Sequence, residues 1–273
     1  MTVAGRAEAR TLVMNPDRAA AHLWAAFLRN RNVDAGTAGD GAIPVAGGYA
    51  IYVTGTLFDF AMGAGSTRAL RDDDLAVVEE FYAARAHPAR LELDEAVLAR
   101  DGALLRDRGY SDEDETLAML EGALDVAPRS DGVAVRTITN RRAWTDLAMR
   151  AFDETPAPRD VLRRTLQTAA AAAHVLVVAS IDGDDAGLGA LGIAGETALM
   201  WSGGVLPAYR RRGVHQALLA ARLAIAHERG ATTAAIKTLA GSPVERSAVK
   251  LGLARTGLRR RVRRDAPGTA AEK

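Results

Sequence analysis

An internal repeat constrains the fold of this chain more than any other feature of its sequence. A short helix is expected to end at Gly109 in the first half and at Gly252 in the second, an offset of 143 residues (252 − 109). A helical pattern that opens at Asp72 has its counterpart near His215, and a strand follows each of these helices. A final strand-like run closes each half. The sequence therefore predicts two copies of one α/β (α+β, mixed-sheet) unit.

Length and composition agree with a division into two domains. The chain has 273 residues, of which 48% are hydrophobic, and this is enough for two buried cores. The stretch from Val126 to Gly132 contains proline, serine and glycine and is the expected linker. We predict a first domain at 1–127, a second at 132–265, and a disordered tail at 266–273.

Capping residues mark several helix starts independently of the repeat. Asn15 before Pro16 opens the first helix, and Ser242 before Pro243, with Glu245 in the capping-box position, opens a later one. In the second half we expect strands at 133–138, 175–181, 186–193, 197–205, 233–238 and 255–262, and helices at 142–152, 158–172, 214–229 and 243–251.

Charge and composition exclude several classes of function. Lys and Arg number 35 against 34 Asp and Glu, so the chain as a whole has no strong attraction for nucleic acid or for a membrane surface. The absence of cysteine excludes disulfides, thiolate metal sites and cysteine nucleophiles. Met1 to Arg10 does not read as a secretory signal, and the longest apolar stretch, Ala169 to Ile181, is too short to cross a bilayer. We expect a cytoplasmic protein, either a monomer or a homodimer.

The segment Val205 to Gln216 lies between a predicted strand and an amphipathic helix. The start of a helix presents free N–H groups and the positive end of the helix dipole. Gly213 lets the backbone approach a phosphate, and Arg210, Arg211 and Arg212 supply guanidinium groups. A pyrophosphate is the natural ligand of such a segment.

Here the chain resembles the GCN5-related N-acetyltransferase (GNAT) superfamily. The pyrophosphate loop of that family reads Arg or Gln, two residues, Gly, one residue, then Gly or Ala. Arg210 to Gly213 match this pattern, whereas His215 stands at the position of the last Gly or Ala. Val205 and Leu206 resemble the end of the strand that splays to bind the pantetheine arm, and Ser242 to Leu253 resembles the shorter helix of the fold.

The resemblance covers about Val133 to Arg264, and the repeat extends it to the first half. That half has no glycine in Ser66 to Arg71, the stretch aligned with the loop, so we expect a degenerate first copy and two tandem GNAT folds. The resemblance implies acetyl-CoA or another acyl-CoA as cofactor and no metal. The residues expected to bind it are Val205, Leu206, Arg210, Arg211, Arg212, Gly213, Val214, His215 and Ser247.

The catalytic residues are less defined. Members of the family generally use a carboxylate as base and often a tyrosine on the shorter helix as acid, but Met200 to Gly204 carries no carboxylate and Ala248 occupies the tyrosine position. Four weak candidates remain. Asp153 and Glu154 are either bases or solvated loop charges, Tyr209 is either an acid or packs against the sheet, and His215 is either functional or an ordinary first-turn residue.

Three further features have a structural and a functional interpretation. Trp201 either lines an acceptor pocket or is an ordinary aromatic residue of the sheet face. Asp182 to Asp185 reads as a hairpin turn rather than a metal site. The arginines of Leu258 to Arg264 either form a solvated strand edge that discourages pairing or contact an acidic substrate.

The function implied by the resemblance is an N-acetyltransferase that transfers an acetyl group to an amine of a small molecule, by direct attack in a ternary complex. The empty base and acid positions keep two alternatives open. One is a module that binds acyl-CoA or another ligand without catalysis. The other is a GNAT fold recruited to different chemistry in a biosynthetic pathway.

Overall fold

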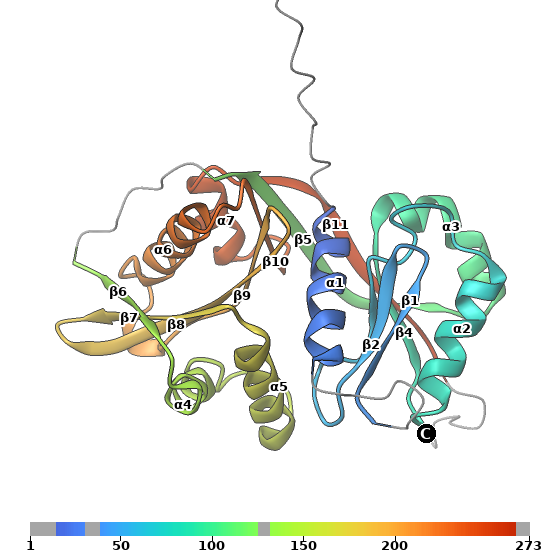
Figure 1. Ribbon diagram of the computed structural model, residues 1–273, viewed down its shortest axis with the longest axis horizontal. Helices are drawn as coiled ribbons and strands as arrows, with labels where there is room; N and C mark the ends of the chain where they lie inside the picture. Colours follow the sequence, from blue (N-terminus) through green and yellow to red (C-terminus); the bar gives the residue numbers. More distant parts are fainter. Residues whose placement is uncertain (1–14, 31–38, 125–131, 266–273) are drawn as a thin grey trace, which may run out of the picture.

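The computed structural model describes residues 15–30, 39–124 and 132–265, which form two lobes joined by one continuous sheet (Figure 1). The N-terminal ten residues, most of the predicted linker and the predicted tail at 266–273 lie outside the described residues. No helix in the described part is long and apolar enough to cross a membrane.

The first half supplies three helices and five strands among its described residues. They are α1 (Pro16–Arg29), β1 (Gly41–Val45), β2 (Gly48–Tyr52), β3 (Ala61–Met62), α2 (Asp72–Ala83), β4 (Ala89–Asp94), α3 (Glu95–Asp107) and β5 (Ser111–Ala123). The second half supplies β6 (Ala134–Ile138), α4 (Arg141–Ala151), α5 (Arg159–Ala172), β7 (Val175–Ile181), β8 (Asp184–Ala194), β9 (Thr197–Val205), the 3₁₀ turn η1 (Pro207–Tyr209), α6 (Val214–Glu228), β10 (Thr233–Leu239), α7 (Pro243–Lys250) and β11 (Ala254–Arg264).

These elements confirm the predicted repeat. Helices α1 and α5 begin at Pro16 and Arg159, and strands β5 and β11 begin at Ser111 and Ala254. Both offsets equal 143 residues (159 − 16 and 254 − 111). The predicted mixed α/β fold with two tandem copies is therefore correct.

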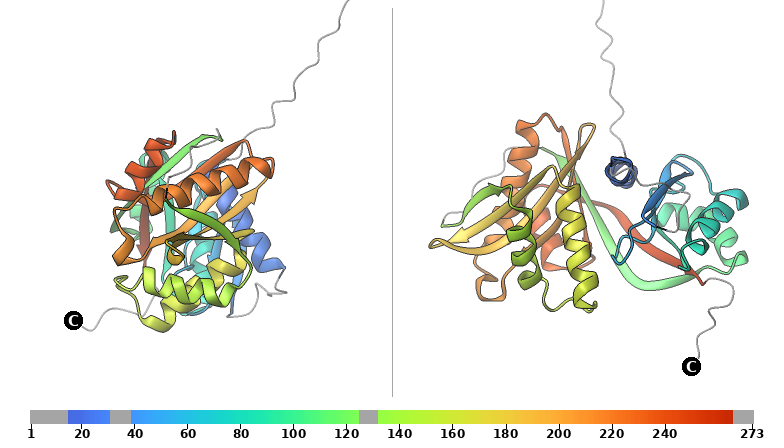
Figure 2. Two further views of the ribbon diagram at one scale, coloured as in Figure 1. Left: turned by 90° about the vertical axis from the view of Figure 1, so that its left-hand side faces the viewer. Right: turned by 60° about the horizontal axis from the view of Figure 1, so that its bottom comes forward.

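The order of the strands shows how the two copies are joined. It reads β1-β2-β3-β4-β11-β5-β10-β9-β8-β7-β6, which is symmetric about the central pair β11 and β5, apart from the additional β6 at one end. The last strand of each copy pairs with the other copy: β5 pairs with β10, and β11 pairs with β4, both antiparallel. In Figure 2 these two strands cross from one lobe to the other. The copies thus exchange their final strands.

This exchange corrects the predicted role of the arginine run at 258–264. One of the two interpretations, a solvated strand edge, is wrong, because β11 has a neighbouring strand on each side. Its arginines instead pair with carboxylates of the first half. Arg259, only 2% exposed, lies 2.6 Å from Asp17 and 2.6 Å from Asp94. Arg260 pairs with Asp112, Arg261 with Glu92 and Glu115, and Arg264 with Glu79. The run therefore holds the two halves together.

A buried ion pair lies at the same junction. Glu92 of β4 is 3% exposed and accepts hydrogen bonds from Lys237 of β10 and from Arg261 of β11. Both cations also lie over the ring of Phe60, Arg261 with its Cζ 4.4 Å from the centroid. The cluster connects β4, β10 and β11. Removing one of its members would leave a buried charge without a partner, which is strongly destabilising.

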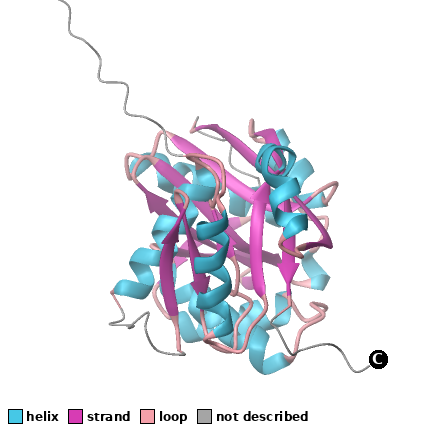
Figure 3. Cartoon of the chain, turned by 90° about the vertical axis from the view of Figure 1, so that its right-hand side faces the viewer, coloured by secondary structure: helices cyan, strands magenta, loops and turns pink. Residues whose placement is uncertain are grey.

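Helices cover both faces of the sheet, as the cartoon in Figure 3 shows. In the second lobe, α4 and α5 bury one face together with Leu176, Val178 and Leu188, and α6 and α7 pack on the other face. In the first lobe, α2 and α3 cover one face and α1 lies at the junction of the lobes. Trp24 of α1 is 6.0 Å from Trp201 of β9, measured between ring centroids.

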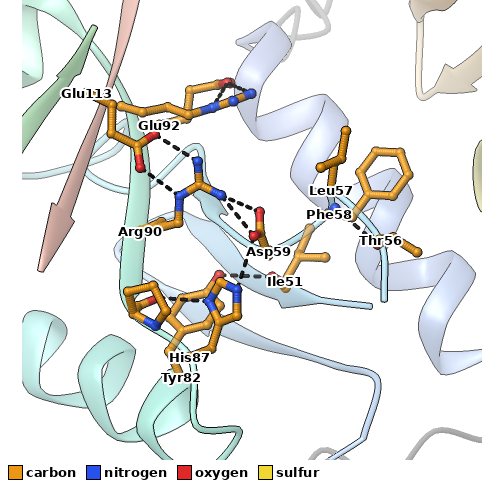
Figure 4. A network of polar contacts seen from close by, with 12 residues as sticks. Ile51, Thr56, Leu57, Phe58, Asp59, Tyr82, His87, Arg90, Glu92 and Glu113 are labelled. Atoms are coloured by element: carbon orange, nitrogen blue, oxygen red, sulfur yellow. Dashed lines mark hydrogen bonds and ion pairs between the residues drawn. The ribbon is translucent and has the colours of Figure 1, made fainter. Parts of the chain in front are cut away.

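A second charged network stabilises the first lobe (Figure 4). Arg90 of β4 lies between Asp59, whose Oδ1 is 2.8 Å away, and Glu113 of β5, whose Oε2 is 2.8 Å away. His87 Nε2 lies 3.2 Å from the same Asp59 carboxylate. The network connects β4, β5 and the loop between β2 and β3, and Tyr82 adds a buried hydroxyl that donates to Ile51 O at 2.9 Å.

The predicted local signals are also confirmed. Asn15 caps α1, its Oδ1 accepting from the N–H groups of Asp17 and Arg18 at 3.0 and 3.2 Å. Ser242 caps α7, its Oγ accepting from the N–H of Glu245 at 3.2 Å. The turn between β7 and β8 is the predicted hairpin, with φ of 54° at Asp182 and 90° at Gly183.

Candidate functional site

The site begins where β9 and β10 separate. The two strands pair in parallel only from Thr197 to Met200 on β9 and from Thr233 to Ile236 on β10. Beyond Met200, the segment Trp201 to Val205 is paired with β8 alone. Its other edge therefore has backbone groups available to a ligand. Helix α7 packs against β10 and α6 beside this opening.

A β-bulge lies in the same segment of β9. Trp201 pairs with Ala190 and Gly204 pairs with Leu188, so Ser202 and Gly203 together face the single residue Gly189. Ser202 has φ of 48°, in the left-handed region. Such a bulge bends the strand and changes the direction of its backbone groups at the point where β9 leaves β10.

The chain then turns through η1 into the start of α6. Gly213 is the N-cap residue, with φ of 78°, and no side chain caps the first N–H groups of the helix. A Cβ added at Gly213 would meet no atom within 4 Å, so the space in front of the helix start is open. An anion placed there would accept hydrogen bonds from the uncapped N–H groups and would be stabilised by the positive end of the helix dipole.

Three arginines surround this helix start and are weakly held. Arg210 pairs with Glu154 at 3.1 Å, and Arg212 lies 3.8 Å from Asp182. Arg211 forms no ion pair within the described ranges of the chain. The side chains of Arg210 and Arg212 are 43% and 49% exposed. They are accessible to an anionic ligand.

The other residues predicted to bind the cofactor lie around the same opening. Val205 pairs with Gly187, and the N–H of Leu206 donates to Ala186 O at 2.9 Å. The side chains of Leu206 and Val214 are buried, so a role in binding would fall to their backbone. Ser247 lies on α7, where its Oγ donates to Pro243 O at 3.0 Å. The binding roles of these residues stay predictions.

The carboxylate candidates lie beside the arginines. Glu154 is 71% exposed and is held by Arg210, while Asp153 pairs with Arg159. The sequence did not indicate that Glu154 contacts the loop expected to bind pyrophosphate, because 56 residues separate it from Arg210. The structure thus places one candidate base next to the arginines that precede α6.

Tyr209 has a defined place at the rim of the site. Its ring packs against the cores on both faces of the sheet, its hydroxyl donates to Asp184 Oδ2 at 3.3 Å, and Arg212 lies over the ring. Desolvation and the neighbouring Asp184 raise the pKa of the Tyr209 hydroxyl. A raised pKa keeps the hydroxyl protonated at neutral pH, as either an acid or a structural donor requires.

His215 lies beside the β9 bulge, where a Cβ on Gly203 would be 3.4 Å from its Nε2. Both ring nitrogens are buried and have no hydrogen-bond partner among the described residues. Burial, followed by the charge of Arg222, lowers the pKa of His215 to about 4, so the ring is neutral at neutral pH. The proposed base or pyrophosphate contact at this position stays a prediction.

Arg222 is a residue that the sequence reading missed. It lies on α6, is 0% exposed, and donates from Nη1 to Ala190 O at 3.1 Å and to Trp201 O at 3.3 Å. An available signal was its spacing from Leu218, four residues earlier in the apolar stripe, because a residue at i+4 shares that face. Ala248, at the position expected for the tyrosine, is also 0% exposed and packs in the core.

A parallel strand pair that separates beside an uncapped helix start, built into two exchanged copies, defines a tandem GNAT-type fold. Residues 114–238 match the family model described as an acetyltransferase (GNAT) domain. This match overlaps the stretch that resembles GCN5-related N-acetyltransferases in sequence, and the fold is the one that the resemblance predicted. No curated protein matched the chain.

Solved structures show the same fold. A GCN5-related N-acetyltransferase from Kribbella flavida has a TM-score of 0.63 at 18% identity, over 94% of this chain and 97% of that one. A tandem GNAT protein from the clavulanic acid biosynthesis pathway has a TM-score of 0.58 at 16% identity, covering 83% and 82%. A GCN5-related N-acetyltransferase from Sphaerobacter thermophilus has a TM-score of 0.55 at 16% identity, covering 76% and 72%.

Proposed function

We propose that the chain is an acyl-CoA-dependent N-acyltransferase that transfers an acetyl group to an amine of a small molecule. One observation carries the proposal: the unpaired edge of β9 lies directly before the uncapped, arginine-flanked start of α6. The residues present fit acyl-CoA. Gly213 leaves open space for the pyrophosphate, and the free strand edge offers backbone groups to a pantetheine arm.

The chemistry assigned to this site is direct attack. The amine nitrogen forms a bond to the thioester carbon, the carbon–sulfur bond breaks, and the thiolate leaves and takes up a proton. The bulged backbone of Ser202 to Gly204 would hold the carbonyl, so that orientation and electrostatic stabilisation provide the rate enhancement. The amine proton would pass to water: Glu154, the candidate base, pairs with Arg210, which is expected to bind the pyrophosphate, and the pantetheine arm separates the pyrophosphate from the thioester.

Calorimetric titration with acetyl-CoA tests the binding step. Gly213→Glu places a negative charge at the helix start and is expected to abolish binding. The matched control is Gly230→Glu, at the other end of α6. Gly230 has φ of 85°, and a Cβ there also meets nothing within 4 Å, so the control introduces the same strain and charge away from the site. Equal affinity for the two variants would refute the placement of the cofactor.

A non-catalytic module that binds acyl-CoA is the second candidate. The buried Ala248 at the tyrosine position and the absence of a carboxylate in residues 200–204 favour it. Assays of free CoA release with a panel of amines separate the two proposals. Turnover that requires an amine supports the transferase, whereas tight acetyl-CoA binding without release supports the module.

A further inference from the structure

We propose that Arg222 is a positioning residue of the acyl-CoA site: it holds the β9 bulge in the conformation that receives the thioester and places a buried positive charge behind that backbone. The inference rests on the proposed function and extends it to a residue outside the recognised loop. Arg222 lies ten residues beyond Arg212, on α6, and contacts β9 from the face of the sheet that α6 covers.

The hydrogen bonds of Arg222 meet at the bulge. Nε donates to Leu218 O of its own helix at 3.0 Å, and Nη1 donates to the carbonyl oxygens of Ala190 and Trp201. Ala190 and Trp201 are the paired residues that border the bulge on β8 and β9. One rigid guanidinium thus connects α6 to both strands where β9 leaves β10.

Two glycines make room for this side chain. A Cβ on Gly189 would lie 2.8 Å from Arg222 Cζ, and a Cβ on Gly203 would lie 3.2 Å from Arg222 Nη2 and 3.4 Å from His215 Nε2. Both glycines belong to the bulge itself. The side chains of Arg222 and His215 therefore occupy space that is available only because positions 189 and 203 are glycine.

Within the described part of the chain, the Arg222 guanidinium has no counter-charge. Among the described residues Arg222 has no carboxylate partner, and its Nη2 has no hydrogen-bond partner. Burial lowers the pKa of Arg222 to about 10, which leaves it charged at neutral pH. An unpaired buried charge is unfavourable for folding. Its position behind Gly203 would put a positive charge near the backbone that is proposed to hold the thioester carbonyl.

The packing around Arg222 also involves His215, the residue that departs from the family's loop pattern. His215 occupies the position where the resemblance leads one to expect Gly or Ala, and its ring fills the space beside Arg222 under Gly203. Because the ring is neutral, it adds no second charge to the cluster. The His215 ring thus forms part of the packing beside the bulge.

Three variants of the full chain test the proposal. Arg222→Met keeps the length of the side chain and removes both charge and donors, and Arg222→Lys keeps the charge but loses the forked geometry. Arg229→Met is the matched control, since Arg229 is an exposed arginine just after the same helix. Circular dichroism and thermal unfolding first establish that each variant is folded.

Three measurements follow. Amide hydrogen exchange at residues 202–206 is expected to be roughly tenfold faster in Arg222→Met and Arg222→Lys than in the control. The infrared carbonyl band of bound [1-¹³C]acetyl-CoA is expected to lie below that of the free thioester in the wild type, to return toward the free value in Arg222→Met, and to stay low in Arg222→Lys. Affinity for acetyl-CoA is expected to fall about tenfold in Arg222→Met, with a smaller change for CoA.

A folded Arg222→Met variant with wild-type exchange and a wild-type carbonyl band would overturn the proposal. If that variant does not fold, Gly203→Val replaces it, because the new side chain displaces the guanidinium from below the bulge; unchanged exchange and an unchanged band in Gly203→Val would be equally decisive. Failure of the wild type to bind acetyl-CoA would refute the proposed function instead, and hydrogen exchange would still show whether Arg222 holds the bulge.

Discussion

Helices α2 and α6 occupy equivalent places in the two copies but begin with opposite charges. Three arginines precede α6, and Gly213 leaves its first N–H groups uncapped. Helix α2 instead begins with Asp72, Asp73 and Asp74, and the carboxylate of Asp74 accepts from the N–H of Arg71 at 2.9 Å. The start of α2 thus carries carboxylates of its own chain, whereas the equivalent start of α6 is open to an anionic ligand.

The strands before these two helices differ much less. β3 is parallel to β4 only over Ala61 and Met62, so the strands of the first copy also separate. What distinguishes the copies is the chemistry of the helix start. A phosphate there would meet three carboxylates in α2 and three guanidinium groups in the loop before α6. This difference supports the proposal that the second copy, and not the first, binds acyl-CoA.

The largest effect is expected where the first copy holds the second. Glu92→Gln removes the carboxylate shared by Lys237 and Arg261, and we expect a loss of about 3 kcal/mol in the free energy of unfolding, with acetyl-CoA affinity little changed. Urea titration measures the loss. Glu115→Gln is the control, because Glu115 is a 44% exposed partner of the same Arg261 and should matter little. Equal effects of the two variants would contradict a buried structural role.

The pH dependence of stability gives a second test of the role of Glu92. Burial raises the pKa of Glu92, but Lys237 and Arg261 outweigh it and hold the pKa below its ordinary value of 4.5. A lowered folded-state pKa means that the stabilisation is complete above pH 4.5 and is lost as the pH falls through the folded value. The stability difference between wild type and Glu92→Gln should therefore shrink on acidification below pH 4.5. A constant difference would show that Glu92 does not contribute as a carboxylate.

Reversing the charges before α6 should make the second copy resemble the first. In Arg210→Glu/Arg211→Glu/Arg212→Glu we expect acetyl-CoA affinity to fall about a hundredfold, because three charge-assisted contacts become repulsive. Arg106→Glu/Arg229→Glu/Lys250→Glu changes the net charge equally on exposed positions elsewhere and serves as control. Both variants are titrated with acetyl-CoA at the same salt concentration. A similar loss of affinity in the control would show that the net charge, and not the position of the arginines, causes the effect.

The smallest effect is expected at the start of α2. Asp74→Ala removes a carboxylate that accepts from Arg71 N and pairs with Arg68 at 2.6 Å, and we expect a loss of about 1 kcal/mol in stability. Thermal unfolding measures it, with Asp73→Ala as the neighbouring control. No change in acetyl-CoA affinity is expected. Weaker binding in Asp74→Ala would show that the first copy takes part in the site.

Local signals predicted much of this fold and part of the site. The caps at Asn15 and Ser242, the hairpin at Asp182 and the glycine before α6 depend on neighbours within a few residues, and each was recognised from the sequence. The boundaries predicted for the two domains stay a prediction. The strand order adds that their last strands are exchanged.

The exchange itself had no local signal. A strand-like run indicates pairing but not the partner, because β5 beside β4 and β5 beside β10 require the same alternation of side chains. Arg259 illustrates the point, since its partner Asp17 is 242 residues away. Arg222 was missed for a similar reason: its partners are carbonyl oxygens of a bulge, which the sequence does not display.

The exchanged strand also sets an order for folding during synthesis. Asp94 at the end of β4 and its register partner Arg259 are 165 residues apart (259 − 94), and β11 is translated after every other described element. Until β11 leaves the ribosome, the first lobe has an incomplete sheet whose β4 edge is open to wrong partners. The nascent chain must protect that edge for most of its translation, and a truncation within β11 would therefore affect the lobe that was made first.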